Sequence, residues 1–428
     1  MKILHLLSSV KGGAANSAVR LHLGLLGSGI DSKILTLDPG DGSIPGCHRY
    51  FPSYLEPAAA PLGTRIRAKT DRLAREFGIH AFTPPQALSH NDYLLNRPAG
   101  LEMFSNPLSG LDIVSHPLCR EADLINLHWV AGFLDYTDFF SRIGKPVVWT
   151  LHDMNAFTGG CHYHQACPGF TDSCQLCPQL DGTIDPAYSS RLFDIKKEAL
   201  SRFRNLTIVT PSAWLGKQSE SSLLFSGRPH FLIPYGLDTD HFQPRERSYS
   251  AKLLGLPEGK KVLLFVADSV HNSRKGYRIL LEAIRELPGS RDFIIAAIGK
   301  TEAGAKPDGV FELGRIDNEL MMSVAYSAAD LFVIPSLEDN LPNTVLESLC
   351  CGTPVAGFRI GGIPDMVSDG VNGLLCGKTD ATSLAATITR CFHELSFNRE
   401  EISRDARKKY TLKRQAEAYV ELYKNLIG

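Results

Sequence analysis

Three acidic side chains lie close together in the segment PSLEDNLPNTVLESLCCGTPV, which runs from residue 335 to residue 355. Glu338 and Asp339 come first, and Glu347 follows eight positions after Asp339. The segment continues the apolar run ADLFVIPS and leads into a helical pattern, so it belongs at the carboxyl end of a strand, a phosphate-facing position in a parallel sheet. Asp339 then lies in the loop and Glu347 on the first turns of the next helix. One pocket can receive both carboxylates.

Histidines and glycines stand at comparable points in the first half of the chain. A lone histidine is usually structural, but His128 ends the buried run INLHW, and His152 with Asp153 ends the run VVWTLHD. Side chains at the carboxyl ends of neighbouring parallel strands share one edge of a sheet, so these three are candidates for one site. Gly12 and Gly13 follow the first apolar run, where a glycine turn lets backbone amides approach a phosphate.

Four cysteines occur in the segment CHYHQACPGFTDSCQLC, which begins at residue 161. Cys174 and Cys177 form a C-x-x-C pair, whose two thiolates can chelate one zinc ion, and the spacing between Cys161 and Cys167 is looser. Nearby histidines can substitute for a thiolate. We expect a structural Zn²⁺ held by the four cysteines, with free or buried thiols, or an iron–sulfur or redox site, as alternatives.

The composition indicates a globular protein with two domains. The chain has 428 residues, of which 43% are hydrophobic and 21% charged, close to the average for globular proteins. Its 45 Lys plus Arg and 46 Asp plus Glu leave a formal charge of -1, which provides no field to attract nucleic acid. The first apolar run is too short for a signal peptide and no run is long enough to span a bilayer, so we expect a cytoplasmic protein.

Apolar runs alternate with helical patterns along most of the chain, as in parallel sheets covered by helices. The first half contains KILHLLSS, SKILTL, ADLINLHW, KPVVWTLHD and NLTIVTPS, and the second contains KKVLLFVADS, DFIIAAIGK, ADLFVIPS and GTPVAGF. A linker rich in proline, glycine and charge lies near residues 236–250. Residues 39–115 show little periodicity. Within them, residues 64–78 form a basic amphipathic pattern, which suits either an anionic membrane surface or packing on its own domain.

The segment ADLFVIPSLEDNLPNTVLESLCCGTPVAGFRIGGIPDMVSDGVNGLLC resembles the donor-sugar site of the family 4 retaining glycosyltransferases, which have the GT-B fold. Further matches are KGGA at residue 11, PSAWL at 211, IPYGLDTDHFQP at 233, RKGYRILLEAI at 274 and GRIDNELMMSVAYSAAD at 314. Together they cover most of the chain outside residues 39–115. The region from INLHW to CPQL is similar to a bacterial subset that builds exopolysaccharides and O-antigens.

This resemblance implies an α/β protein with two Rossmann-like domains that face each other across a cleft. Residues 1–235 would form the acceptor-binding domain, to which a C-terminal helix at residues 410–428 returns. Residues 236–409 would form the domain that binds the nucleotide-sugar donor.

The family carries two glutamates separated by seven residues at the donor site. The register that aligns NLPNTVLE puts Asp339 in the first position, and Glu338 is one residue too early. The resemblance implies that Glu347 binds the ribose hydroxyls and that Asp339 contacts the donor sugar or faces its anomeric carbon. The shorter acid is a departure that is compatible with a changed sugar preference, with Glu338 turned into the site, or with reduced activity.

Lys275 matches the lysine that pairs with the donor diphosphate. The family usually also carries an arginine in a Gly-Arg dipeptide, which is absent here. The planar guanidinium of Arg274 can replace that arginine as a phosphate ligand. The resemblance implies that His128 bonds the donor-sugar hydroxyls and acts in catalysis with Asp339 and Lys275. It places His152 and Asp153 on the acceptor side, which the cysteine segment would shape. The implied donor-binding residues are Gly12, Gly13, Arg274, Lys275, Arg315, Asn340, Leu341 and Glu347.

The implied reaction moves a hexosyl unit, with retention, from a UDP- or GDP-linked sugar to a saccharide or polyprenyl-diphosphate-linked acceptor at the inner face of the cell membrane. A lysine and backbone amides would neutralise the leaving diphosphate, so no catalytic cofactor is expected beside the structural zinc. Two alternatives stay open: a sugar-nucleotide epimerase with the same fold, and a catalytically inactive, zinc-stiffened module that binds a sugar or a nucleotide.

Overall fold

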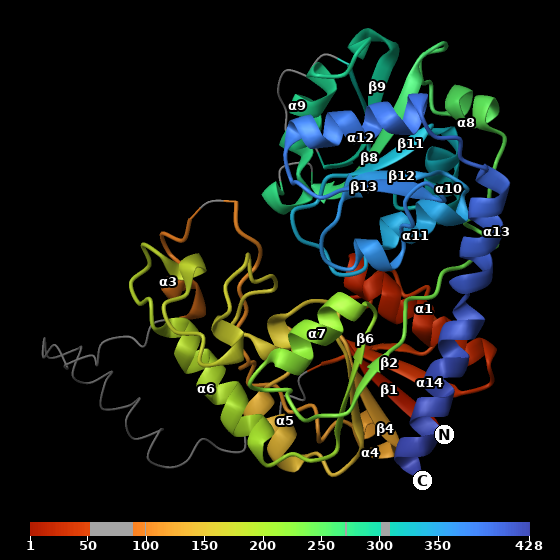
Figure 1. The fold of residues 1–428 in the computed structure, drawn as a ribbon. Coiled ribbons are helices and arrows are strands. Elements are labelled where there is room, and N and C mark those ends of the chain that lie inside the picture. Colours follow the sequence, from red (N-terminus) through yellow and green to blue (C-terminus); the bar gives the residue numbers. More distant parts are fainter. Residues whose placement is uncertain (52–88, 99, 270–271, 301–308) are drawn as a thin grey trace, which may run out of the picture.

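The computed structural model describes residues 1–51, 89–98, 100–269, 272–300 and 309–428, which form two parallel sheets covered by helices (Figure 1). The basic pattern at residues 64–78 lies outside the described residues. Within the described ranges, no helix is long and apolar enough to cross a membrane.

The first sheet has seven described strands in the order β3-β2-β1-β4-β5-β6-β7, and neighbouring strands are parallel. We call this sheet with its helices the first lobe. Its strands are β1 (Lys2–Leu6), β2 (Asp31–Thr36), β3 (Cys47–Arg49), β4 (Leu124–Leu127), β5 (Val147–Thr150), β6 (Leu206–Thr210) and β7 (His230–Leu232). Its helices are α1 (Gly13–Gly27), α3 (His90–Tyr93), α4 (Pro117–Glu121), α5 (Tyr136–Arg142), α6 (Tyr188–Ser201) and α7 (Ala213–Ser221), with short 3-10 turns at Asn155–Phe157, Gly169–Thr171 and Pro178–Leu180.

The second sheet has six described strands in the order β10-β9-β8-β11-β12-β13, again all parallel. This sheet with its helices is the second lobe. Its strands are β8 (Lys261–Ser269), β9 (Phe293–Lys300), β10 (Val310–Gly314), β11 (Leu331–Ile334), β12 (Val355–Phe358) and β13 (Gly373–Cys376). Its helices are α8 (Arg247–Leu253), α9 (Tyr277–Arg285), α10 (Glu319–Ala328), α11 (Asn343–Cys350), α12 (Ala381–His393) and α13 (Arg399–Lys409), with 3-10 turns at Ser273–Lys275, Ser290–Asp292 and Ile363–Asp365.

Every apolar run named from the sequence forms a strand, which confirms the predicted α/β class with two Rossmann-like sheets. In each sheet the strand order reverses between the first strand and the strand beside it, β1 and β4 in one and β8 and β11 in the other. Crevices at such switch points, outside the carboxyl ends of the strands, are where ligands bind in open parallel sheets. Except for Arg315, which follows the edge strand β10, the candidate residues follow strands at or next to these points.

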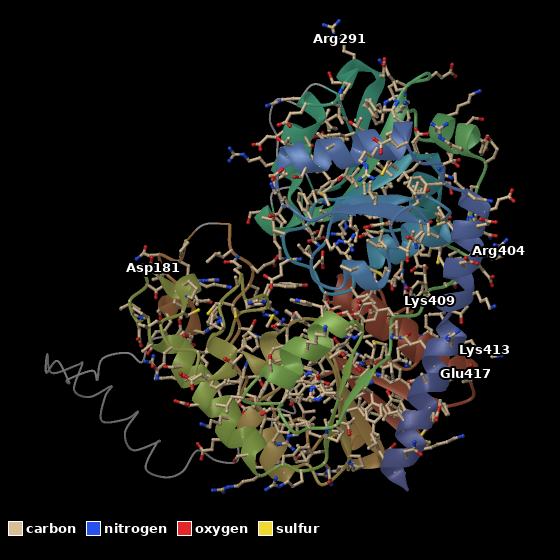
Figure 2. The ribbon with its side chains drawn as sticks, viewed as in Figure 1. Asp181, Arg291, Arg404, Lys409, Lys413 and Glu417 are labelled. Carbon is tan, nitrogen blue, oxygen red and sulfur yellow. The ribbon has the colours of Figure 1, made fainter. Side chains whose placement is uncertain are left out.

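The C-terminal helix α14 (Leu412–Ile427) packs against α1 of the first lobe, after α13 and α14 have run down one side of the molecule (Figure 1). Tyr419 and Tyr423 are fully buried there, and their hydroxyls bond Thr150 at 2.9 Å and Asn126 at 2.6 Å. Lys413, on the same helix, projects outward (Figure 2). The domain boundary that the sequence predicts near residue 235 falls between β7 and β8 and stays a prediction.

Candidate active site

The loop after β11 brings opposite charges of the second lobe together. Lys275 ends the 3-10 turn that follows β8, and its Nζ lies 2.6 Å from Asp339 Oδ2 because β8 and β11 are neighbours. Burial raises the pKa of Asp339, but the positive charges of Lys275 and Arg274 outweigh burial, so the pKa of this carboxyl lies below its ordinary value. Asp339 is therefore an ionised carboxylate that is paired with Lys275.

Two glycines let the backbone pack closely enough to form this pair. Gly276 has a φ of 68°, and a Cβ there would lie 1.9 Å from Pro335 O. A Cβ at Gly361, with a φ of 53°, would lie 1.7 Å from Asp339 O. No side chain fits at either position, so the glycines fix the loop after β11 against the turn that carries Lys275.

Glu338 points away from Lys275 and toward the first lobe. Its carboxylate accepts hydrogen bonds from the backbone amides of His164 at 3.3 Å and Gln165 at 3.0 Å, and it lies 3.3 Å from His164 Nε2. Gln165 and Ala166 have φ values of 47° and 65°, a left-handed turn whose amides converge on an anion. Glu338 thus holds the cysteine segment of the first lobe, and Asp339 is the acid that pairs with Lys275. The predicted role of Asp339 at the donor sugar stays a prediction.

Arg274 also ties the two lobes together. Its Nε donates to Glu102 Oε1 at 2.5 Å and its Nη1 donates to Glu338 O at 2.7 Å. The guanidinium lies over the ring of Tyr163, 4.0 Å from the ring centroid. These contacts use Nε and Nη1 of the guanidinium that the sequence offered as a replacement phosphate ligand. Among the described residues Lys275 bonds only Asp339, so two of its three N–H groups stay available to a phosphate.

Glu347 is buried, with 7% of its surface exposed, on the first turns of α11. Its Oε1 accepts a hydrogen bond from Arg20 Nη2 at 2.9 Å, and its Oε2 accepts one from Tyr326 Oη at 2.9 Å. Arg20 belongs to α1 of the first lobe and Tyr326 to α10 of the second. The predicted ribose ligand is therefore held by both lobes.

His128 is the middle of a buried chain of hydrogen bonds in the first lobe. Its Nε2 lies 2.8 Å from His5 Nδ1, and its Nδ1 lies 3.0 Å from His152 Nε2. His152 Nδ1 in turn lies 2.7 Å from Tyr235 Oη. Burial lowers the pKa of all three histidines, that of His152 to about 4, so the imidazoles are neutral at pH 7.

All hydrogen bonds in a chain of neutral imidazoles run in the same direction, because each ring has one donor and one acceptor nitrogen. His5 Nε2 is buried without a partner among the described residues. An unpaired buried N–H is rarer in proteins than an unpaired acceptor, so His5 donates from Nδ1, and His128 accepts at Nε2 and donates from Nδ1. Both nitrogens of His128 are occupied, and a bond to a sugar hydroxyl requires one of them to be released. The predicted role of His128 stays a prediction.

The predicted acceptor-side residues do come together. His152 and Asp153, together with His128, line one pocket at the ends of β4 and β5. Asp153 accepts hydrogen bonds from Trp129 Nε1 at 2.9 Å and from His162 Nδ1 at 2.7 Å. Burial raises the pKa of Asp153, and the His162 imidazole outweighs this, so the pKa lies below its ordinary value.

The remaining donor-side predictions fall at the contact between the lobes, in the core of the second lobe or at the surface. Gly13 O accepts a hydrogen bond from Asn343 Nδ2 at 3.0 Å, and the space where a Cβ of Gly12 would point is open. Asn340 Nδ2 donates to His152 O at 3.0 Å, which joins the lobes again. Leu341 is buried in the core of the second lobe, and Arg315 is half exposed and pairs with Asp317 at 2.7 Å.

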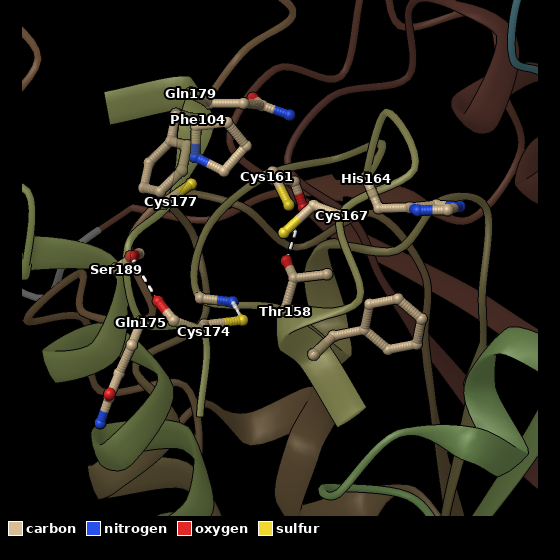
Figure 3. A pocket seen from close by; sticks show the side chains of 13 residues that line it. Phe104, Thr158, Cys161, His164, Cys167, Cys174, Gln175, Cys177, Gln179 and Ser189 are labelled. Atoms are coloured by element: carbon tan, nitrogen blue, oxygen red, sulfur yellow. Dashed lines mark hydrogen bonds between the residues drawn. The ribbon is translucent and has the colours of Figure 1, made fainter. Parts of the chain in front are cut away.

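The four cysteines line one pocket, together with Phe104, His164 and Ser189 (Figure 3). Each is a free thiol, and two sulfurs already accept backbone bonds, Cys174 Sγ from Gly159 N at 3.1 Å and Cys167 Sγ from Gly169 N at 3.5 Å. In the described part of the chain, no group of three or more Cys, His, Asp or Glu is placed to hold a metal ion. The structure therefore does not show the predicted zinc site. Of the four thiols Cys174 is buried, which raises its pKa to about 12, and the other three are partly exposed.

Three contacts that matter here were not predicted from the sequence. Arg20 lies inside an ordinary helical pattern, Glu102 lies in the segment without periodicity, and Tyr326 reads as a core residue of its helix. Arg20 and Glu102 stand in no quoted motif, and the segment GRIDNELMMSVAYSAAD, which contains Tyr326, gives that residue no role. Only the packing of one lobe on the other reveals their partners.

Comparison with known proteins finds a family match in the second lobe. Residues 260–394 match the model of the family "Glycosyl transferases group 1". The chain is 27% identical over 278 residues to the putative teichuronic acid biosynthesis glycosyltransferase TuaC of Bacillus subtilis, which covers 62% of this chain and 69% of that protein. It is 35% identical over 168 residues to the D-inositol 3-phosphate glycosyltransferase of Mycolicibacterium smegmatis, over 36% of this chain and 38% of that protein.

Solved structures match over the whole chain. The HepE protein of Anabaena in complex with UDP-glucose aligns with a TM-score of 0.64 and 17% identity, covering 99% of this chain and 100% of that one. Sucrose-phosphate synthase from Thermosynechococcus elongatus aligns with a TM-score of 0.64 and 17% identity, covering 100% and 99%. At this identity the likeness concerns the fold, and it agrees with the two parallel sheets. Residues 260–394 thus form a glycosyl transferases group 1 domain, within a chain that has the GT-B fold.

Proposed function

We propose that the protein is a retaining glycosyltransferase of family 4, which transfers a hexosyl unit from a nucleotide sugar to a saccharide acceptor. The observation that carries the proposal is the pairing of Lys275 with Asp339 in the loop before α11, the helix that bears Glu347. A cation, a sugar-facing carboxylate and a ribose-facing carboxylate then surround one helix start, inside the segment that matches the glycosyltransferase family.

The positive charge serves the donor diphosphate. Lys275 offers two further N–H groups, and no described side chain caps the first turn of α11, whose amides and helix dipole favour an anion. Such preorganised donors stabilise the charge that develops on a leaving phosphate. Asp339, held beside Lys275, would face the donor sugar, and Glu347 would bind the ribose hydroxyls.

The reaction is mainly a matter of positioning. The bond between the anomeric carbon and the donor phosphate oxygen breaks, and a bond from that carbon to the acceptor oxygen forms on the same face. The proton of the acceptor hydroxyl passes to the leaving phosphate oxygen. The pocket lined by His128, His152 and Asp153 would hold the acceptor and the sugar edge.

The relatives suggest which substrates to test first. The HepE structure contains UDP-glucose, so UDP is the first donor base to test and GDP the second. TuaC is named for teichuronic acid biosynthesis, which favours a cell-surface polysaccharide and a polyprenyl-diphosphate-linked acceptor at the inner face of the membrane. Neither the epimerase nor the inactive module finds support in these matches.

The proposal is tested by acceptor-dependent release of nucleoside diphosphate, with the anomeric configuration of the product read by NMR. Asp339→Asn should bind nucleotide normally and lose at least about a hundredfold in turnover, since it removes a group proposed to act on the transition state. Glu338→Gln is the matched control, because Glu338 contacts the cysteine segment and should keep most of the turnover. Full activity in Asp339→Asn with loss in Glu338→Gln would contradict the assignment, and interconversion of two nucleotide sugars without acceptor would identify an epimerase.

A further inference from the structure

Helix α1 of the first lobe docks on the start of α11 of the second. Asn343 Nδ2 donates to Gly13 O at 3.0 Å and lies 2.9 Å from Ser17 Oγ. Residues 13, 17 and 20 share one face of α1, as helical spacing requires, and residues 343 and 347 share one face of α11. Docking of the first turns therefore brings Arg20 against Glu347.

Arg20 is buried between carboxylates of the other lobe. Only 5% of its surface is exposed, and its Nη2 lies 2.9 Å from Glu347 Oε1 and 2.8 Å from Glu319 Oε1. Burial lowers the pKa of Arg20, but the charges of the two carboxylates outweigh burial and raise it. A buried guanidinium at bonding distance from two carboxylates is a fixed, charge-assisted contact, not a solvated surface pair.

Among the described residues, only two contacts use the acceptor positions of the Glu347 carboxylate. A carboxylate has about four acceptor positions, two on each oxygen. Arg20 occupies one position on Oε1 and Tyr326 occupies one on Oε2. The remaining two, one on each oxygen, match the two adjacent hydroxyls of a ribose.

We propose that Arg20 is a positioning residue for the ribose of the nucleotide donor, supplied by the first lobe to a site in the second. It fixes the orientation of the Glu347 carboxylate so that the two free acceptor positions meet the 2′- and 3′-hydroxyls. The inference rests on the proposed role of Glu347. Its consequence is that recognition of the ribose depends on the docking of the two lobes.

The test compares UDP with 2′,3′-dideoxy-UDP by calorimetric titration of the full-length protein, with GDP and its dideoxy analogue where UDP gives no heat. The wild type should bind UDP at least about tenfold more tightly than the dideoxy analogue, since two hydrogen bonds to a carboxylate are lost. Arg20→Met should reduce this ratio at least about threefold, by weakening UDP and leaving the analogue unchanged. Arg20→Lys keeps the positive charge but lacks the planar guanidinium, so it should give an intermediate ratio. It replaces Arg20→Met in the comparison if Arg20→Met does not fold.

Arg228→Met is the matched control, because Arg228 is a partly buried arginine of the first lobe that bonds only the backbone carbonyls of Leu200 and Phe203 among the described residues. It should keep the wild-type ratio. Equal weakening of UDP and its analogue by Arg20→Met, or an unchanged ratio, would overturn the positioning role. Glu347→Gln separates the two claims. An unchanged ratio in Glu347→Gln overturns the proposed ribose site itself, whereas a collapsed ratio there with a normal ratio in Arg20→Met overturns only the role of Arg20.

Discussion

At the scale of single residues, the buried histidines of the first lobe make stability depend on pH. Burial lowers the pKa of His5, His128 and His152 in the folded protein, that of His152 to about 4. In the unfolded chain a histidine titrates near pH 6.5. Between these two values the unfolded chain binds more protons than the folded one, so the folded state loses stability as the pH falls.

We therefore expect the free energy of unfolding of the first lobe to fall by about 2 kcal/mol between pH 7 and pH 5 for His152 alone. The three tryptophans, Trp129, Trp149 and Trp214, all lie in the first lobe, so urea unfolding followed by their fluorescence reports on it. His152→Gln should reduce the loss between the two pH values, and His48→Gln, at an exposed histidine, should not. An equal loss of unfolding free energy between pH 7 and pH 5 in the wild type and in His152→Gln would contradict the assigned role of His152 in this pH dependence.

At the scale of the elements, the sequence predicted the central strands and missed the edges. The strands named from apolar runs include β1, β4, β5, β8 and β11, which helices cover on both faces, so their sequences are continuously apolar. The strands that were not named are β3, β7, β10 and β13, all at or next to a sheet edge. β7, for example, is three residues long with none of them buried. Short, partly exposed strands carry too little periodicity to be recognised.

The loops were predictable where a motif spans them and unpredictable where the two lobes meet. The register of NLPNTVLE placed Asp339 beside the site, and the structure pairs it with Lys275. Cysteine spacing, by contrast, indicates only which thiolates can reach one metal ion. Whether the sulfurs converge depends on the surrounding backbone, and among the described residues no three Cys, His, Asp or Glu side chains are placed to hold one metal ion.

Close backbone packing between the loop after β11 and the turn that carries Lys275 gives a testable prediction at this scale. Gly276→Ala places a Cβ against Pro335 O, so the turn that carries Lys275 must shift. We expect nucleotide binding to weaken about tenfold or more and stability to fall by about 1–3 kcal/mol from the overpacking. Isothermal calorimetry and thermal unfolding measure the two effects.

Gly255→Ala is the control for the backbone conformation alone. Gly255 has a φ of 67°, against 68° for Gly276, and nothing lies within 4 Å of the place where its Cβ would be. Both substitutions therefore carry the same left-handed strain, and only Gly276→Ala adds the clash. Similar nucleotide affinities in the two variants would show that the approach to Pro335 does not position Lys275.

At the scale of the whole molecule, the lobes are joined by polar side chains that surround the proposed donor site. Arg20 contacts Glu347, Glu102 contacts Arg274, and Glu338 holds the backbone of the cysteine segment. Each contact joins residues more than a hundred positions apart, so no local sequence pattern predicts it. The same contacts place residues of the first lobe around the proposed nucleotide site of the second lobe, which contains the residues that match the family model.

The most direct test of the account is calorimetric binding of UDP, GDP, ADP and TDP to the full-length protein, with Lys275→Met and Glu347→Ala beside the wild type. The account predicts that one nucleotide binds in the micromolar range and that each variant weakens its binding at least about tenfold, because each removes a charged contact. Binding of none of the four, or equal binding by the wild type and both variants, would contradict the donor site around Lys275 and Glu347.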